Sequence, residues 1–119
     1  SVPVGGRVAG NGRIAGVRAA VGGRGSNVVA VGVTGCGNGG ILLDTKLRPI
    51  RCGILASDTR AAEFARKGEY PGQTSVLLRW LRARKPQVMR RLHRVAFWKD
   101  YVRLRLTDEF TTEPTDVGA

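Results

Sequence analysis

Two residues of this chain have side chains that could bind a polar ligand together. Asp58 and Arg60 lie two residues apart and follow the apolar run Ile50–Leu55. A carboxylate accepts hydrogen bonds and a guanidinium donates several, so the two groups suit a polyhydroxyl ligand. A simple ion pair that holds the loop is the alternative interpretation of the same two residues.

A glycine-rich segment, Gly35–Gly40, follows the apolar run Val28–Val33. The run is rich in β-branched residues and has no polar position, which is typical of a strand buried on both faces. Open α/β sheets bind ligands in the loops at the carboxyl ends of their strands. The glycine-rich segment and the Asp58–Arg60 segment are therefore both expected to follow strands at such a position.

Three of the glycines, Gly35, Gly37 and Gly40, also have the G-x-G-x-x-G spacing of dinucleotide-binding proteins. That fingerprint needs a helix that opens at the glycines and directs its N-terminus at the pyrophosphate. The apolar residues 41–43, followed by Asp44 and Pro49, leave no room for an amphipathic helix, and no acidic residue stands at the expected distance. The sequence therefore disfavours a dinucleotide site.

Five collinear motifs resemble the N-terminal domain of the FGGY carbohydrate kinases, the group that contains the xylulose, L-xylulose and glycerol kinases. In chain order they are VGVTG with its glycine-rich loop at 31–40, ILASDTRA at 54–61, YPGQT at 70–74, LLRWL at 77–81, and KDYVRLRLT at 99–107 with PTD at 114–116. The resemblance covers roughly residues 27 to 119.

The resemblance implies an α/β fold of the ribonuclease-H-like, actin-like class and ATP-dependent phosphorylation of a sugar or polyol hydroxyl. The substrate-binding residues that it implies are Cys36, Gly37, Asn38, Asp58, Arg60 and Gln73. For Cys36, a small turn residue without contact to a ligand is an equally open interpretation. ATP and Mg²⁺ are expected for the complete enzyme and not for this segment, because the family's first phosphate loop lies upstream of the match and its catalytic aspartate and adenine-binding domain lie downstream. No catalytic residue and no metal ligand is therefore expected here.

Short elements must position these residues. Apolar runs between turn signals predict strands near residues 28–34, 41–44, 50–55 and 94–98. Helices are predicted near residues 59–67, 74–85, 87–93 and 100–106, with Thr74 as the N-cap of the second and Pro86 between the second and third. Trp80 and Trp98 are expected to pack in the core, although stacking on a ligand is possible for an indole ring. Residues 44–48 lack the glycine of a tight Asp-Gly turn, so a loose connection is expected there.

The composition suggests a second class of function. The net charge of +11 and the pI of about 11.2 are typical of a small basic nucleic-acid-binding protein. A basic band is formed by Arg82, Arg84, Lys85, Arg90, Arg91, Arg94, Arg103 and Arg105. The lone His93 lies among these cations and is expected on the surface. Ordered motifs are more specific than composition, so the kinase interpretation comes first and nucleic acid second.

The remaining features concern location and domains. Cys36 and Cys52 have no C-x-x-C spacing and no histidines nearby, which is typical of reduced thiols in a cytoplasmic protein. No membrane-spanning run and no signal peptide is apparent. Residues 1–26 contain no acidic residue and many glycines, so they form either a flexible arm or a two-turn helix at residues 14–21. Residues 27–119 are then an incomplete N-terminal domain of a sugar kinase.

Overall fold

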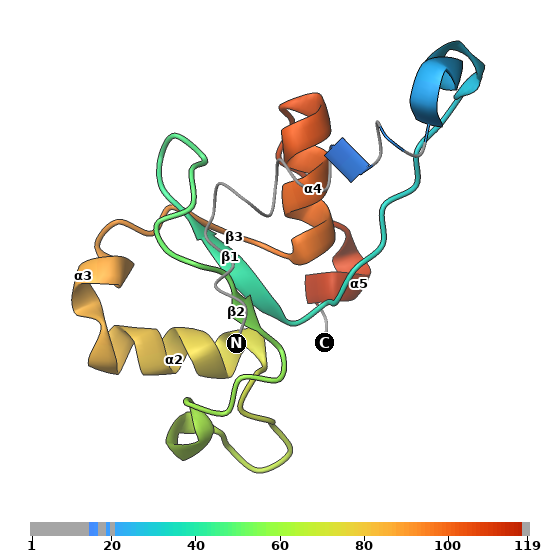
Figure 1. Cartoon of the computed structure of the whole chain (residues 1–119). Helices are drawn as coiled ribbons and strands as arrows, with labels where there is room; N and C mark the ends of the chain where they lie inside the picture. The colour runs from blue at the N-terminus through green and yellow to red at the C-terminus, as the bar shows by residue number, and fades with distance from the viewer. Residues whose placement is uncertain (1–14, 17–18, 20, 118–119) are drawn as a thin grey trace.

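The computed structural model describes residues 15–16, 19 and 21–117, and a three-stranded antiparallel sheet lies at its centre (Figure 1). The strand order is β2-β1-β3, with β1 at Gly39–Leu43, β2 at Ile54–Leu55 and β3 at Arg94–Ala96. Gly39 of β1 pairs with Leu55, and Ile41 pairs with Ala96 on the other side. All five residues of β1 are buried, as an uninterrupted apolar strand requires.

The strand predicted at residues 28–34 is wrong. The backbone there forms no ladder, and Val29 is 99% exposed. A β-branched run becomes a strand only where a partner strand and a packing surface are present. Both edges of β1 are occupied by β2 and β3, so β1 offers no place for a further strand. The glycine-rich segment therefore leads into β1 instead of following a strand.

The other strands are confirmed with altered bounds. The strand predicted at 41–44 begins earlier, at Gly39, and ends at Leu43. The strand predicted at 50–55 shrinks to Ile54–Leu55, and only an isolated bridge between Leu43 and Pro49 precedes it. The strand predicted at 94–98 ends at Ala96, because Trp98 already belongs to the next helix.

The helices agree with the prediction in order but not always in length. The helix α2 spans Thr74–Arg84, α3 spans Pro86–Met89, α4 spans Trp98–Thr107 and α5 spans Pro114–Val117. The predicted helix 87–93 is thus a single turn that begins at Pro86. In place of the helix predicted at 59–67 there is one 3₁₀ turn, η2, at Ala62–Phe64. Its bonds, such as Phe64 N–H to the Ala61 carbonyl at 2.9 Å, close i to i+3 and do not continue as an α-helix.

Thr74 does not cap α2 as predicted. The N-cap is Gln73, which makes no capping bond with its side chain. The Thr74 hydroxyl instead donates to the Gly39 carbonyl at 2.8 Å. Its oxygen is therefore used to tie the start of α2 to β1.

The helices α2 and α4 cover opposite faces of the sheet (Figure 1). Successive side chains of a strand point to opposite faces, so Leu42 packs toward α2 while Ile41 and Leu43 pack toward α4. The α2 cluster contains the predicted apolar face of that helix, Val76, Leu77, Trp80 and Leu81. The α4 cluster contains Trp98, Tyr101 and Leu104. Core packing of Trp80 and Trp98 is therefore confirmed.

The connection between residues 44 and 48 is tight, contrary to the prediction. The Asp44 carboxylate accepts hydrogen bonds from the N–H groups of Lys46 and Arg48, both at 2.9 Å. Leu47 adopts the left-handed conformation, with φ at 54°. These bonds to Asp44 hold a turn that would otherwise need glycine.

The arm predicted at residues 1–26 is described only in part. Residues 1–14, 17–18 and 20 lie outside the described residues, so the two interpretations of the arm are not decided. Ala15, Gly16 and Ala19 are helical and exposed, and a 3₁₀ helix, η1, follows at Gly22–Asn27 without any buried residue. Among the helices that the structure describes, none is long and apolar enough to cross a membrane.

Candidate functional site

Hydrogen bonds join the glycine-rich segment to the start of α2. The Thr74 N–H donates to Asn38 Oδ1 at 3.4 Å, and the Gly39 N–H donates to the Gly72 carbonyl at 3.1 Å. The Thr74 hydroxyl bond to Gly39 adds a third contact. The structure therefore brings two of the predicted site residues, Asn38 and Gln73, to one place from segments that are 35 positions apart.

Two glycines permit this close approach of backbones. A Cβ atom on Gly72 would lie 1.6 Å from the Ala56 carbonyl oxygen, which no side chain tolerates. Gly39 has φ at 77°, and a Cβ there would lie 2.3 Å from the Ile54 carbonyl oxygen. Both glycines are thus required where β1, the end of β2 and the loop before α2 meet.

Asp58 and Arg60 form an ion pair with each other. Arg60 Nε lies 2.8 Å from the Asp58 carboxylate, which also accepts the Arg60 N–H at 3.0 Å. The Arg60 guanidinium lies over the Trp80 ring, 5.5 Å from its centroid, and so connects this loop to α2. The loop-holding interpretation is therefore what the structure shows. The Arg60 side chain is nevertheless 48% exposed, which leaves several of its N–H groups open to solvent.

A groove of about 790 Å³ runs between the extended segment 31–36, the loop after β2, and α4. Cys36 and Ser57 line it, together with Trp98 and Val102. Of the six predicted site residues only Cys36 faces this groove. Gly37 lies beside Asp116, whose Oδ1 would be 3.2 Å from a Cβ on that glycine.

The six predicted residues therefore do not form one cluster. Cys36 lines the groove, and Asn38 and Gln73 lie at the start of α2. Asp58 and Arg60 lie in the loop that Arg60 connects to Trp80, and Gly37 lies beside Asp116.

Lys99 is a residue that the sequence reasoning did not assign to the site. Lys99 Nζ lies 2.8 Å from Asp116 Oδ2 and also pairs with Glu113. A Cβ on Gly35 would lie 3.2 Å from the Lys99 backbone nitrogen, so α4 closely contacts the glycine-rich segment. The KDY motif at 99–101 was the available signal, but the motif alone does not reveal which acidic residues Lys99 contacts.

Two carboxyl groups away from the groove have altered acidity. The Arg48 backbone N–H that donates to Asp44 lowers the pKa of that carboxyl. The Arg66 backbone N–H that donates to Glu69 lowers the pKa of Glu69, and the ion pair with Arg79 acts in the same direction. Within the described part of the chain, no group of three His, Cys, Asp or Glu residues is placed to hold a metal ion.

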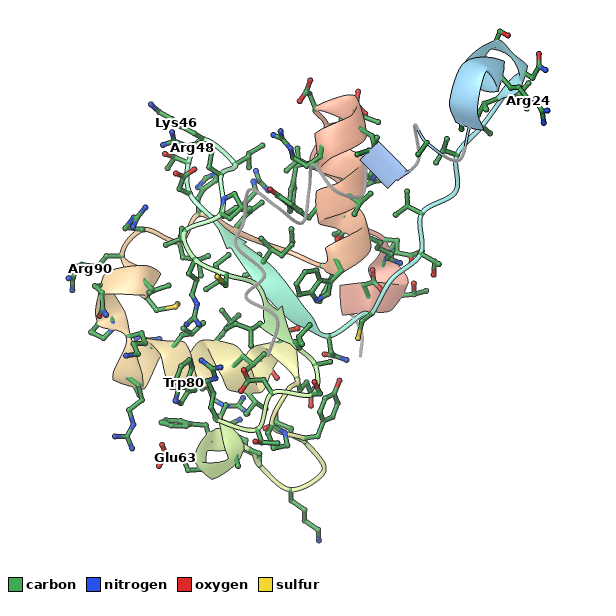
Figure 2. All side chains as sticks on the ribbon, viewed as in Figure 1. Arg24, Lys46, Arg48, Glu63, Trp80 and Arg90 are labelled. Atoms are coloured by element: carbon green, nitrogen blue, oxygen red, sulfur yellow. The ribbon has the colours of Figure 1, made fainter. Side chains whose placement is uncertain are left out.

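The cations of the basic band have separate environments. Arg84 pairs with Glu63 at 2.9 Å, and Arg94 lies over the Phe110 ring at 5.1 Å from its centroid. Figure 2 shows Arg90 of the band far from Arg24 and Arg48, two arginines that do not belong to the band. His93 is exposed, as predicted.

Comparisons with known proteins show which family this chain resembles. Residues 64–119 match the N-terminal domain of the FGGY family of carbohydrate kinases. The chain is 33% identical over 106 residues to a xylulose kinase of Escherichia coli (strain K12), covering 77% of this chain and 22% of that protein. It is 29% identical over 108 residues to a probable L-xylulose kinase of Pasteurella multocida (strain Pm70), covering 77% of this chain and 22% of that protein.

A solved structure agrees with these relatives. The crystal structure of a xyloylose kinase from Brucella ovis superposes with a TM-score of 0.67 at 30% identity, covering 76% of this chain and 22% of that chain. This chain thus spans 22% of the length of the curated relatives that it matches. These relatives give no support to the nucleic-acid alternative. The chain carries part of the N-terminal domain of the FGGY family of carbohydrate kinases.

Proposed function

We propose that this chain is the sugar-contacting segment of a complete kinase that transfers a phosphoryl group from ATP to a hydroxyl of a sugar or polyol. The observation that carries this proposal is the 33% identity to a xylulose kinase over 106 residues. The superposition on a xyloylose kinase structure over 76% of the chain supports it. We also propose that the segment belongs to a ribonuclease-H-like, actin-like domain, since the sheet flanked by α2 and α4 is consistent with that fold.

The sugar contacts are proposed at Cys36, Gly37, Asn38, Asp58, Arg60 and Gln73. Asn38 accepts a hydrogen bond from Thr74 through Oδ1, and its amide NH₂ makes no hydrogen bond to the residues that the structure describes. That NH₂ can donate to a sugar hydroxyl. Arg60 keeps exposed N–H donors beyond its bond to Asp58. A hydroxyl both donates and accepts, so donors held at fixed positions suit a polyol.

ATP and Mg²⁺ are proposed to bind in the complete enzyme outside this segment. Phosphoryl transfer needs a cradle for the β- and γ-phosphates, carboxylates that hold the metal, and a base for the attacking hydroxyl. The Gly35–Gly40 segment contains no lysine and does not have the P-loop pattern. We place the complete enzyme in the cytoplasm, in keeping with the exposed free thiols of Cys36 and Cys52.

The test is a chimaera in which this segment replaces the matching 106-residue stretch of the Escherichia coli xylulose kinase. Because the proposal assigns sugar contacts to this segment, the chimaera should release ADP in a sugar-dependent manner. Folding is monitored by circular dichroism, and ATP binding by the titration of a non-hydrolysable analogue. A chimaera that folds and binds the analogue but shows no turnover with any pentulose, hexulose or polyol would refute the proposal.

A further inference from the structure

A second pocket, of about 480 Å³, lies between the extended segment 31–33 and α4. Three aliphatic residues, Val31, Val33 and Leu106, line part of it. The lining also contains charged residues, namely Lys99, Asp100, Arg103 and Glu113. None of the six proposed sugar contacts lines this pocket, although Val31, Val33 and Leu106 also line the groove of about 790 Å³ described above.

Asp100 and Arg103 have side-chain atoms that are buried without a partner. Asp100 is 4% exposed, and its Oδ2 makes no hydrogen bond to any residue that the structure describes. Arg103 Nη2 is likewise buried and has no hydrogen-bond partner among the described residues. The two residues lie three positions apart, which places them on one side of α4, yet they form no ion pair with each other.

Neighbouring charged side chains do not supply the missing partners of Asp100 and Arg103. Lys99 also lines the pocket, but its ammonium group is paired with Glu113 and Asp116. Buried charged groups normally have a partner, because removing them from water without one is costly. A carboxylate can only accept hydrogen bonds and a guanidinium can only donate them. A molecule that satisfies both must therefore present a donor and an acceptor to α4.

The charges and the walls together narrow the class of ligand. A polyol would hydrogen-bond to both groups but would neutralise neither charge. A zwitterion places a cation on Asp100 and an anion on Arg103, and a carboxylate can bind a guanidinium through two parallel hydrogen bonds. The aliphatic wall of Val31, Val33 and Leu106 suits an apolar substituent better than it suits hydroxyl groups.

We propose that this pocket binds a small aliphatic α-amino acid. Its ammonium group donates to Asp100, its carboxylate accepts from Arg103, and its side chain packs against Val31, Val33 and Leu106. The proposal does not depend on the sugar-kinase function, because none of the residues that it uses is a proposed sugar contact.

The test is a titration of the isotope-labelled 119-residue chain with L-valine, followed by amide NMR shifts. Saturable shifts are expected at residues 31–33 and 100–107. Valinol, which lacks the carboxylate, and isovalerate, which lacks the ammonium group, should each bind at least about tenfold more weakly. Absence of saturable shifts with L-valine would overturn the proposal. Equal or tighter binding of xylitol would overturn it as well, because the pocket would then be a polyol site.

Matched variants test the two charged groups separately. Asp100→Asn and Arg103→Gln should each weaken L-valine binding by about tenfold or more, whereas Arg103→Lys should retain part of the affinity. Arg105→Gln is the control, because Arg105 is exposed on the same helix and does not line the pocket. Unchanged affinity in both charge-removing variants would refute the assignment. If either variant fails to fold, the comparison of L-valine with valinol and isovalerate in the unaltered chain decides.

Discussion

Arg60 has contacts that serve the fold and donors that can serve a ligand, and a substitution separates the two roles. In the chimaera, Arg60→Ala should raise the KM for the sugar and leave ATP binding unchanged. It should also lower the free energy of unfolding by about 1 kcal/mol, because the cation–π contact with Trp80 is lost. Steady-state kinetics and urea denaturation measure the two effects. A variant that loses stability but keeps its sugar kinetics would leave Arg60 as a structural residue only.

The carboxyl groups of Asp44 and Glu69 predict the direction of acid sensitivity. Their pKa values in the folded chain are lowered from ordinary values of 3.8 and 4.5. A lowered pKa means that each ionised carboxylate stabilises the fold at pH values above its ordinary pKa. This stabilisation is lost as the pH falls through the pKa of the folded state. The double variant Asp44→Asn, Glu69→Gln should therefore be less stable near neutral pH and should lose less stability on acidification. The measurement is urea denaturation from neutral pH down through the folded pKa values. An equal loss of unfolding free energy in the variant and the unaltered chain would contradict the prediction.

The helix α4 ends in a conformation that glycine would adopt more easily. Asp108 is its C-cap, with φ at 59°, and its N–H donates to the Leu104 carbonyl at 2.9 Å. A carboxylate at a helix C-terminus also faces the negative end of the helix dipole. Asp108→Gly should thus stabilise the chain by about 0.5–1 kcal/mol, since the Asp108 side chain is exposed and glycine adopts this conformation without strain. Asp108→Ala is the matched variant and should destabilise. Equal stability of both variants in urea would contradict this explanation.

The elements that the sequence predicted well are those whose local pattern and tertiary packing agree. The apolar positions of α2 recur at helical spacing, and the same positions pack against β1. The pattern of residues 28–34 is equally strong, but a strand requires a partner, and pairing is not encoded locally. Thr74 was misassigned for a similar reason, because its hydroxyl bonds to Gly39 and not to its own helix.

Sequence spacing did not show how the predicted site residues are arranged in the folded chain. The proximity of Asn38 to the start of α2 depends on the close backbone approach at Gly39 and Gly72, which sequence spacing does not show. The ion pair of Asp58 with Arg60 was weighed as an alternative, because two residues so near in sequence can meet within one loop. Asp100 was part of the KDYVRLRLT motif but was not assigned to a site, since burial decides its importance and burial is a property of the folded chain.

The sheet has two packed faces, and the described residues that precede Val28 include none that is buried. The residues of η1 are exposed, as are Ala15, Gly16 and Ala19. Ordering glycine-rich backbone costs roughly 1–2 kcal/mol per residue, and no burial offsets that cost at Ala15, Gly16, Ala19 or in η1. A chain that begins at Ser26 should therefore melt within about 5 °C of the full 119-residue chain. A larger drop in Tm would show that residues 1–25 pack against the fold.

The central claim is that this segment binds sugar but does not perform phosphoryl transfer. The most direct test measures sugar-dependent ADP release by the purified 119-residue chain and by the chimaera. The assay covers a panel of pentuloses, hexuloses and polyols, with the Escherichia coli xylulose kinase as positive control. We expect release from the chimaera and none above background from the chain alone, because the phosphate cradle, the metal ligands and the base are proposed to lie elsewhere in the complete enzyme. Sugar-dependent release from the chain alone, in a preparation free of host kinase, would contradict this division of roles.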